Sequence, residues 1–254
     1  MTVSATFGMR SPGIGAPMPT DSAKAASARI LHALEVPLLI AVPAALLVCA
    51  YLNIPQSALL TALVALLAIL LLFAGFEASR PTLREVMPSV VLGAVAAAGR
   101  ILFAPIPDFK PVSAIAIMSG AVFGRHCGFM VGALAALVSN AFFGQGSWTP
   151  WQMYAWGLLG YLAGVFAERG WTDRPWFRYG FAFASGLLYG LILDTWNLVG
   201  WVHPITWQSA VANYALGLPH SVTHGIATLV FLRLIWQPWV CKLARVHTKY
   251  AIRG

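Results

Sequence analysis

Charged residues are scarce in this chain. They make up 9% of the sequence, and hydrophobic residues make up 59%, whereas an ordinary globular domain carries roughly 25% charged residues. The mean hydropathy is +0.75. A soluble chain of this length could not bury so much apolar surface, and the long apolar runs do not alternate as membrane-spanning strands do. The composition therefore predicts an all-α polytopic membrane protein.

Two kinds of motif are also missing. The three cysteines, Cys49, Cys127 and Cys241, show neither metal-ligand nor redox spacing. The phosphate-binding pattern G-x-x-x-x-G-K-[ST] does not occur in the sequence, so the chain does not bind ATP through such a loop. We therefore expect a protein without a cofactor that is not itself an enzyme.

Eight apolar segments predict about eight helices, although a spanning helix needs about 20 residues and one segment is shorter. They lie near 36–52, 57–76, 86–103, 112–124, 128–143, 151–167, 177–200 and 209–236. The short run at 112–124 must be helped by its flanks or be buried among other helices. Residues 1–35 are predicted to be a flexible tail with an interfacial helix at 21–35, and residues 237–254 a basic tail.

The positions of the basic residues predict the orientation. With the N-terminus inside, all of the 16 Lys and Arg residues except Arg100 and Lys110 fall at the cytoplasmic side. This bias favours an even number of spans with both termini in the cytoplasm. The positive charge is spread over loop ends that face the lipid bilayer, so we expect no nucleic-acid partner.

The uncharged stretch from Phe143 to Met153 is predicted to be an outward-facing loop over a pocket. Its sequence, FGQGSWTPWQM, combines glycines with two tryptophans, whose large rings each carry one polar N–H. Trp148 and Trp151 are predicted to contact a solute. The alternative is that they belong to an aromatic belt at the interface.

Two charges fall within the predicted spans. Arg100 and Asp194 lie at similar depth near the outer ends of 86–103 and 177–200. An intramembrane charge costs at least about 2.5 kcal/mol on insertion scales, which favours an ion pair or a shared polar pocket. For Arg100 the alternative is a side chain that reaches up to the interface.

The last predicted helix carries polar residues on one face. Asn213, Gly217, His220 and His224 follow each other at spacings of four, three and four. His220 and His224 could hold one metal ion, although no third ligand is evident, and a polar network is the other interpretation. Ser221 next to a histidine could suggest a hydrolase, but neighbouring helical residues point about 100° apart, which is poor geometry for a nucleophile and its base.

Small residues form a face on the 86–103 segment. Ser89, Gly93 and Ala97 recur every four residues, beside Ala94 and Ala98. Such a face lets another helix approach closely. That helix could belong to this chain or to a docked partner.

Together these features resemble the S components of energy-coupling factor (ECF) vitamin transporters. The resemblance covers residues 86–236 and rests on the small-residue helix and on four further stretches: Ala104 to Pro111, Gly120 to Gly124 with Gly128 to Gly132, Ser139 to Gly146, and the tryptophan loop. The order Gly-Gln-Gly followed by Trp-Thr-Pro-Trp is similar to a subgroup that includes cobalamin-type members.

The resemblance implies a fold and a mechanism. Six helices at 86–236 would form a binding protein in a bacterial inner or plasma membrane, with two outer loops as lids over a pocket for a vitamin-like, ring-containing solute. The small-residue face would dock on a membrane coupling subunit, and two ATPase subunits would drive transport. The helix pair at 36–76 is an addition to this family pattern. The alternatives are a metal-ion permease that uses His220 and His224, or an intramembrane hydrolase.

The predicted pocket combines aromatic walls with a few polar groups, as small-molecule sites do. The tryptophans would stack on a flat ring, and the polar side chains would orient it. The candidate substrate-binding residues are Arg100, Asn140, Gln145, Trp148, Trp151, Asp194, Asn197, Asn213 and His220.

Overall fold

The structure is a computed structural model that describes residues 21–52, 57–78 and 82–249. The described residues form helices and no strand. The eight helices are α1 Asp21–Tyr51, α2 Ser57–Ala78, α3 Leu83–Leu102, α4 Val112–Phe123, α5 Arg125–Phe143, α6 Thr149–Glu168, α7 Pro175–Trp201 and α8 Trp207–Lys249. The predicted tail at 1–20 lies outside the described residues.

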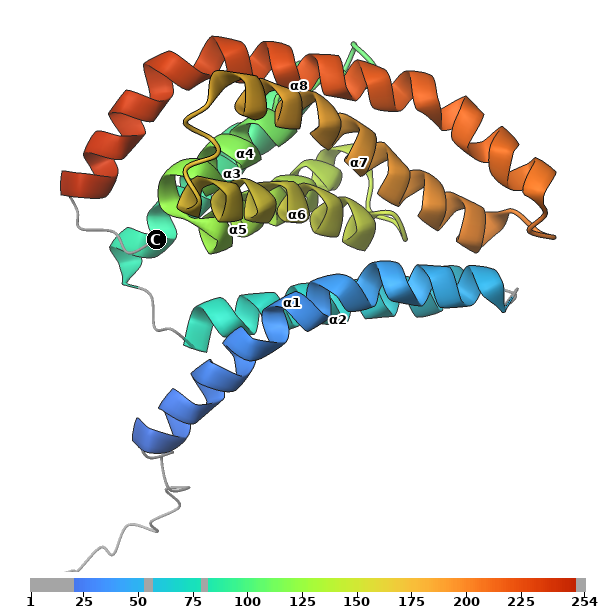
Figure 1. The fold of residues 1–254 in the computed structure, drawn as a ribbon, viewed down its shortest axis with the longest axis horizontal. Helices are drawn as coiled ribbons and strands as arrows, with labels where there is room; N and C mark the ends of the chain where they lie inside the picture. Colours follow the sequence, from blue (N-terminus) through green and yellow to red (C-terminus); the bar gives the residue numbers. More distant parts are fainter. Residues whose placement is uncertain (1–20, 53–56, 79–81, 250–254) are drawn as a thin grey trace, which may run out of the picture.

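Four of these helices, α3, α5, α7 and α8, are long and apolar enough to cross a membrane. Shorter apolar helical stretches lie in α1, α2 and α4. The all-α fold is therefore confirmed for the described residues, and the length and composition of these helices support a protein embedded in a membrane. The helices run back and forth, so that the beginning of α1 and the end of α8 lie at the same end of the molecule, at the left in Figure 1.

Two helices are longer than the apolar pattern indicates. The predicted interfacial helix at 21–35 continues directly into the apolar part of α1, which contains Pro37 and Pro43. Helix α8 continues past residue 236 to Lys249, with Pro219 and Pro238 inside it. Proline removes one backbone hydrogen bond and bends a helix without having to end it, and α8 arches across the bundle in Figure 1.

The short helix α4 lies in the middle of the bundle. It packs against α3, α5, α6, α7 and α8, and every residue from Val112 to Gly120 is buried. A helix enclosed in this way does not have to reach both membrane faces by itself. Its length of 12 residues is therefore explained by its position.

Glycines bring α4, α5 and α6 into backbone contact. A methyl group at Gly120 would lie 2.0 Å from the carbonyl oxygen of Gly160, and one at Gly160 would lie 2.1 Å from that of Gly128. No side chain fits at these three positions. Close approach through small residues is the usual packing of membrane helices, because dispersion contacts replace the hydrophobic effect there.

The small-residue face of α3 packs mainly within the chain. Ser89, Gly93 and Ala97 are buried, and a methyl group at Gly93 would lie 3.1 Å from Cβ of Leu134 in α5. Of the five predicted docking residues, Gly93 lies against α5, Ser89 donates a hydrogen bond to Cys127 of α5, and Ala97 is buried. Ala94 and Ala98 are exposed on α3, and the docking prediction applies to them.

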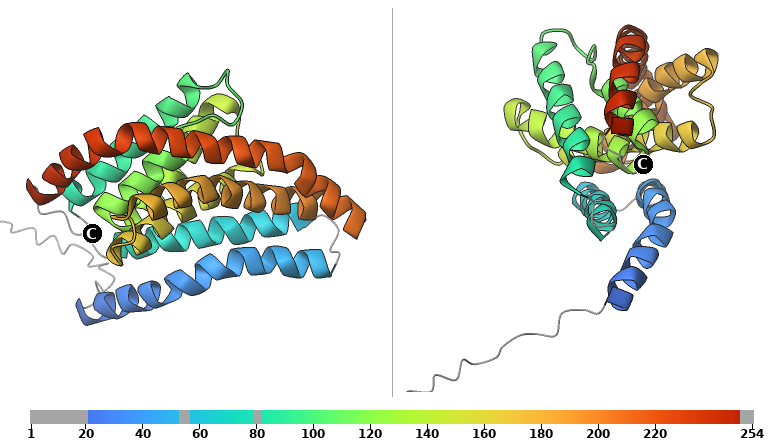
Figure 2. Two further views of the ribbon diagram at one scale, coloured as in Figure 1. Left: turned by 45° about the horizontal axis from the view of Figure 1, so that its top comes forward. Right: turned by 90° about the vertical axis from the view of Figure 1, so that its left-hand side faces the viewer.

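The α1–α2 hairpin lies along one side of the remaining helices (Figure 2). Glu35 of α1 is 5% exposed, and its carboxylate accepts hydrogen bonds from His126 Nε2 at 2.7 Å and from the Tyr161 hydroxyl at 3.2 Å. The Tyr154 hydroxyl donates to the Leu39 carbonyl at 2.6 Å. Polar contacts therefore fix this hairpin to α5 and α6.

Candidate functional site

Arg100, in the last turn of α3, lies between two aromatic rings. Its guanidinium carbon is 4.6 Å from the ring centre of Phe143 and 4.9 Å from that of Trp156. The same group donates hydrogen bonds to Ser139 Oγ at 2.6 Å and to Asn140 Oδ1 at 2.5 Å. Flat guanidinium groups favour such stacking. The side chain is thus directed toward α5 and α6 and is held in one orientation.

Asn140 connects Arg100 to the loop between α5 and α6. Its amide nitrogen donates to Thr149 Oγ1 at 3.0 Å and to Gln152 Oε1 at 2.8 Å. Thr149 donates in turn to Gln145 Oε1 at 2.9 Å. Asn140 is completely buried, so each of these bonds replaces water that the site excludes. The predicted candidates Arg100, Asn140 and Gln145 therefore belong to one network.

Three rings continue the site from α6 into α7 and α8. Trp156 and Tyr189 stack with their centres 4.9 Å apart, and Tyr189 and His224 stack at 4.5 Å. His224 is 3% exposed and its Nε2 is 2.7 Å from Ser113 Oγ in α4. We call Arg100, Phe143, Trp156, Tyr189 and His224 the arginine–aromatic cluster.

The loop between α3 and α4 is held by hydrogen bonds within the loop and by one hydrogen bond to α8. The Lys110 ammonium donates to the carbonyls of Phe103, Ala104 and Ile106. Asp108, whose φ of 54° is in the left-handed region, accepts a hydrogen bond from His220 Nδ1 at 2.6 Å. Burial lowers the pKa of Lys110, and the nearby Asp108 carboxylate opposes that shift. The loop therefore contains both a positive charge, Lys110, and a negative charge, Asp108, and it contacts α8 through Asp108.

The loop also makes an apolar contact with α8. The ring of Phe109 is centred 5.2 Å from that of Phe231, and the ring of Phe103 is 5.0 Å from it. His220 and Phe231 are three helical turns apart, so they lie on one face of α8. The loop thus covers this face between the two residues.

The structure does not bring Trp148 and Trp151 into the cluster. Trp151 is completely buried in α6 and packs edge-on against Tyr154 at 6.5 Å. Trp148 is 40% exposed and lies against Gly146, where a methyl group would be 2.4 Å from its ring. Within the described part of the chain no ring contact joins either tryptophan to Arg100, and Trp156 takes that position.

Asp194, Asn197 and Asn213 form a separate group that joins α7 to α8. Asn197 donates to Asn213 Oδ1 at 2.8 Å, and Asn213 donates to the Asp194 carbonyl at 2.8 Å. The Asp194 carboxylate lies directly over Gly217, where a methyl group would come within 2.1 Å of it. Among the described residues Asp194 and Arg100 form no salt bridge, so the ion pair considered from their similar depth is not present.

His220 and His224 take different partners, Asp108 and Ser113. No group of three His, Cys, Asp or Glu residues in the described ranges could hold a metal ion. Ser221 donates to the Gly217 carbonyl at 3.1 Å, and a methyl group at Gly190 would be 1.8 Å from its oxygen. The Ser221 hydroxyl therefore lies in the contact between α7 and α8.

A comparison with protein families gives a match to a family model. The model of DUF6580, a family of unknown function, matches residues 80–247, which is more than half of the chain. The chain belongs to the DUF6580 family. No curated protein and no solved structure matches it. The DUF6580 match contains α3 to α7, α8 as far as residue 247 and the whole arginine–aromatic cluster, and the α1–α2 hairpin precedes it.

The sequence alone does not indicate that several residues of this DUF6580 site belong to it. Trp156 and Tyr189 look like ordinary aromatic residues of apolar helices, and Asp108 looks like an ordinary loop residue. Their role depends on distant partners, since Asp108 and His220 are 112 positions apart. One signal was present, because His224 shares a helix face with His220 and a lone histidine in an apolar helix requires a polar partner.

Proposed function

We propose that this protein is the substrate-binding membrane subunit of an ECF-type importer and takes up a vitamin-like solute that contains a flat ring. The observation that carries the proposal is the arginine–aromatic cluster. An oriented guanidinium beside a stack of three rings offers both an aromatic wall and fixed hydrogen-bond donors. Small-molecule sites combine these two elements.

The cluster indicates the chemistry of the solute. A planar ring would lie parallel to Trp156 or Tyr189, because offset stacking favours parallel faces. Arg100 would donate to an acidic or carbonyl group at the edge of that ring. The loop from Phe103 to Pro111 would close over the solute, with the contact between Asp108 and His220 as its latch. The protein would lie in a bacterial inner or plasma membrane, with both termini on the cytoplasmic side.

The most direct test is solute binding by the purified full chain. Solutes that co-purify would be identified by mass spectrometry, and thiamine, riboflavin, biotin and cobalamin would be titrated while tryptophan fluorescence is recorded. Arg100→Met and Trp156→Leu should lower affinity for the bound solute at least about tenfold, which corresponds to about 1.4 kcal/mol. The matched control is Trp176→Leu, because Trp176 is 71% exposed outside the cluster. Equal binding by wild type and Arg100→Met would refute the site.

The partners require their own experiment. Co-expression with a coupling subunit and two ATPase subunits should yield a complex that purifies together and makes uptake of the solute depend on ATP. Ala94 and Ala98 lie on the exposed face of α3 and are the proposed contact. Ala94→Trp should disrupt the complex and leave solute binding by the isolated subunit unchanged. Uptake that persists without any ATPase subunit would favour a facilitator instead.

A further inference from the structure

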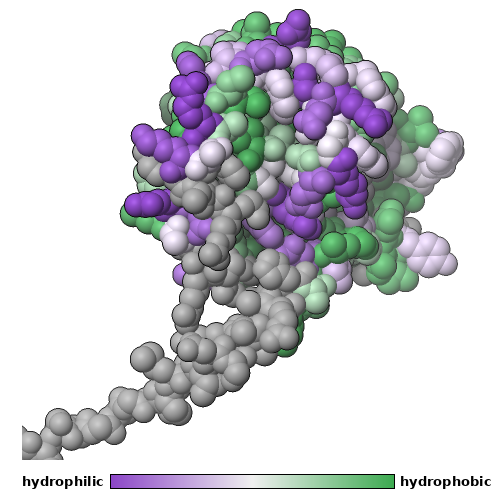
Figure 3. Space-filling model, turned by 60° about the vertical axis from the view of Figure 1, so that its left-hand side comes forward, coloured by the Kyte–Doolittle hydropathy of each residue, from purple (hydrophilic) through white to green (hydrophobic). Residues whose placement is uncertain are grey.

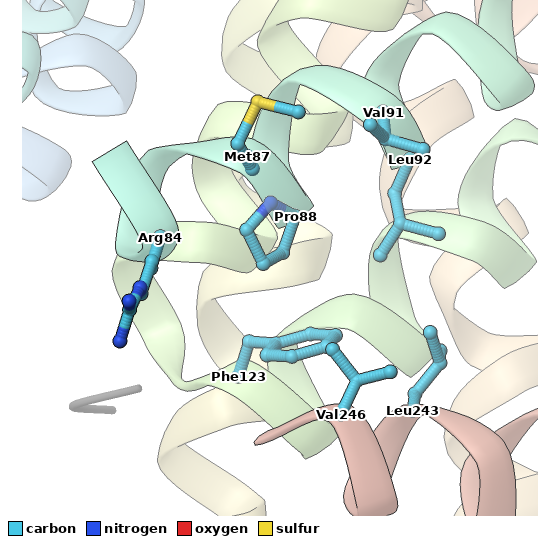
Figure 4. Close-up of a pocket in the computed structure, with 8 residues that line it drawn as sticks. All are labelled: Arg84, Met87, Pro88, Val91, Leu92, Phe123, Leu243 and Val246. Atoms are coloured by element: carbon cyan, nitrogen blue, oxygen red, sulfur yellow. The ribbon is translucent and has the colours of Figure 1, made fainter. Parts of the chain in front are cut away.

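An apolar groove opens at the end of the molecule where α3 begins and α8 ends. Its volume is about 360 Å³, within the range of pockets that hold small molecules. Met87, Pro88 and Val91 of α3 form one wall, Leu243 and Val246 of α8 face them, and Phe123 of α4 lies between (Figure 4). Arg84 stands at the edge of the groove.

Basic side chains near this groove favour a ligand with a negatively charged group. Lys242 and Arg245 each precede a lining residue of α8 by one position, so they lie about 100° around the helix from the groove wall. Arg84 and Arg245 form no ion pair with any described residue. The nearby Glu85 carboxylate accepts a hydrogen bond from the Thr82 backbone N–H. Three basic residues therefore lie on or next to the walls of the groove beside one acidic residue, Glu85, while the groove itself is apolar.

Hydrophilic and apolar side chains are intermingled on the visible surface at this end of the molecule (Figure 3). The arrangement of an apolar slot with cations at its mouth matches one class of partner. We propose that the groove binds an anionic phospholipid of the inner leaflet, with an acyl chain between α3 and α8 and the phosphate at Arg84 and Arg245. Basic pockets between membrane helices bind anionic head groups through the same chemistry. This proposal does not depend on the transport function.

The structure also explains why α8 extends beyond the bundle. Leu243 and Val246 follow Pro238, which lies inside α8, and this last part of the helix forms the second wall of the groove. An α8 that ended at residue 236 would leave Met87 and Val91 of α3, each 48% exposed, without a facing wall. The extension therefore creates a site that α3 alone lacks.

The test uses the delipidated full chain in detergent, with lipid binding measured by native mass spectrometry. Phosphatidylglycerol should bind in preference to phosphatidylcholine. Arg84→Gln and Arg245→Gln should each weaken phosphatidylglycerol binding about 5-fold, and both together about 25-fold, because one basic residue near an anionic lipid is worth about a factor of five. Arg169→Gln is the control, since Arg169 is also exposed but bonds to the Val165 carbonyl outside the groove.

A second pair of variants tests the acyl chain. Val91→Phe fills the groove and should displace phosphatidylglycerol, whereas Val95→Phe, one turn along α3 and 37% exposed, should not. The proposal is overturned if phosphatidylcholine binds equally well, if Val91→Phe leaves binding unchanged, or if the purified chain carries a bound protein in the groove and no lipid.

Discussion

His220 Nδ1 donates a hydrogen bond of 2.6 Å to the carboxylate of Asp108 across 112 positions of sequence. The two side chains are 69% and 35% exposed, so water competes for both. An exposed pair of this kind contributes about 0.2–1 kcal/mol. It can therefore break and re-form readily, as the proposed opening and closing of the loop between α3 and α4 requires.

The first prediction concerns this latch. Asp108→Asn should speed solute release by up to about 5-fold and leave the association rate nearly unchanged, because only the closed loop loses a contact. Stopped-flow tryptophan fluorescence measures both rates. His220→Asn should have the same effect, and the double variant should be no worse than either single variant. Fully additive effects would show that the two residues act independently.

The second prediction concerns Asn140. Asn140→Ala removes an acceptor from Arg100 and a donor from Thr149 and Gln152 in a completely buried place. The loss should lower the free energy of unfolding by about 1–3 kcal/mol. Thermal unfolding in detergent measures it. Asn197→Ala is the control, since Asn197 is exposed, and a loss as large there would argue against a special role for Asn140.

The third prediction concerns the glycine contacts. Gly160→Ala places a methyl group 2.1 Å from the Gly128 carbonyl oxygen, so α5 and α6 must separate, at a cost of about 1–3 kcal/mol or more. Gly180→Ala in α7 meets nothing within 4 Å and should be neutral or stabilising by up to about 1 kcal/mol. The melting temperatures of the two variants should therefore move apart. If they fall equally, the packing between α5 and α6 is looser than described.

The fourth prediction concerns the hairpin. Glu35→Leu removes the carboxylate that accepts hydrogen bonds from His126 and Tyr161 and should cost about 1–3 kcal/mol. Glu35→Gln keeps an acceptor oxygen and should cost clearly less. Denaturant unfolding of the purified variants gives both values. Equal stability of the leucine and glutamine variants would contradict this role of the Glu35 carboxylate.

The sequence was sufficient for the fold class and for most helix positions, because long apolar runs and their flanking charges are local signals. It also identified Arg100, Asn140 and Gln145, which share one network. It did not place Arg100 against Trp156, because that contact depends on how α3 and α6 pack. Nor could spacing show that Ser89 and Gly93 contact α5. A small-residue face looks the same whichever helix covers it.

The glycine contacts have a mechanical consequence. Gly120, Gly128 and Gly160 lock α4, α5 and α6 together, while Gly186 in α7, where a methyl group would lie 2.1 Å from the Gly225 nitrogen, locks α7 to α8. Close-packed backbones resist sliding. Helices α4 to α6 and helices α7 and α8 are therefore two groups joined by close backbone contacts, and the stacked rings of Trp156 in α6 and Tyr189 in α7 lie where the groups meet. Any movement of α7 relative to α6 must therefore change the contact between these two rings.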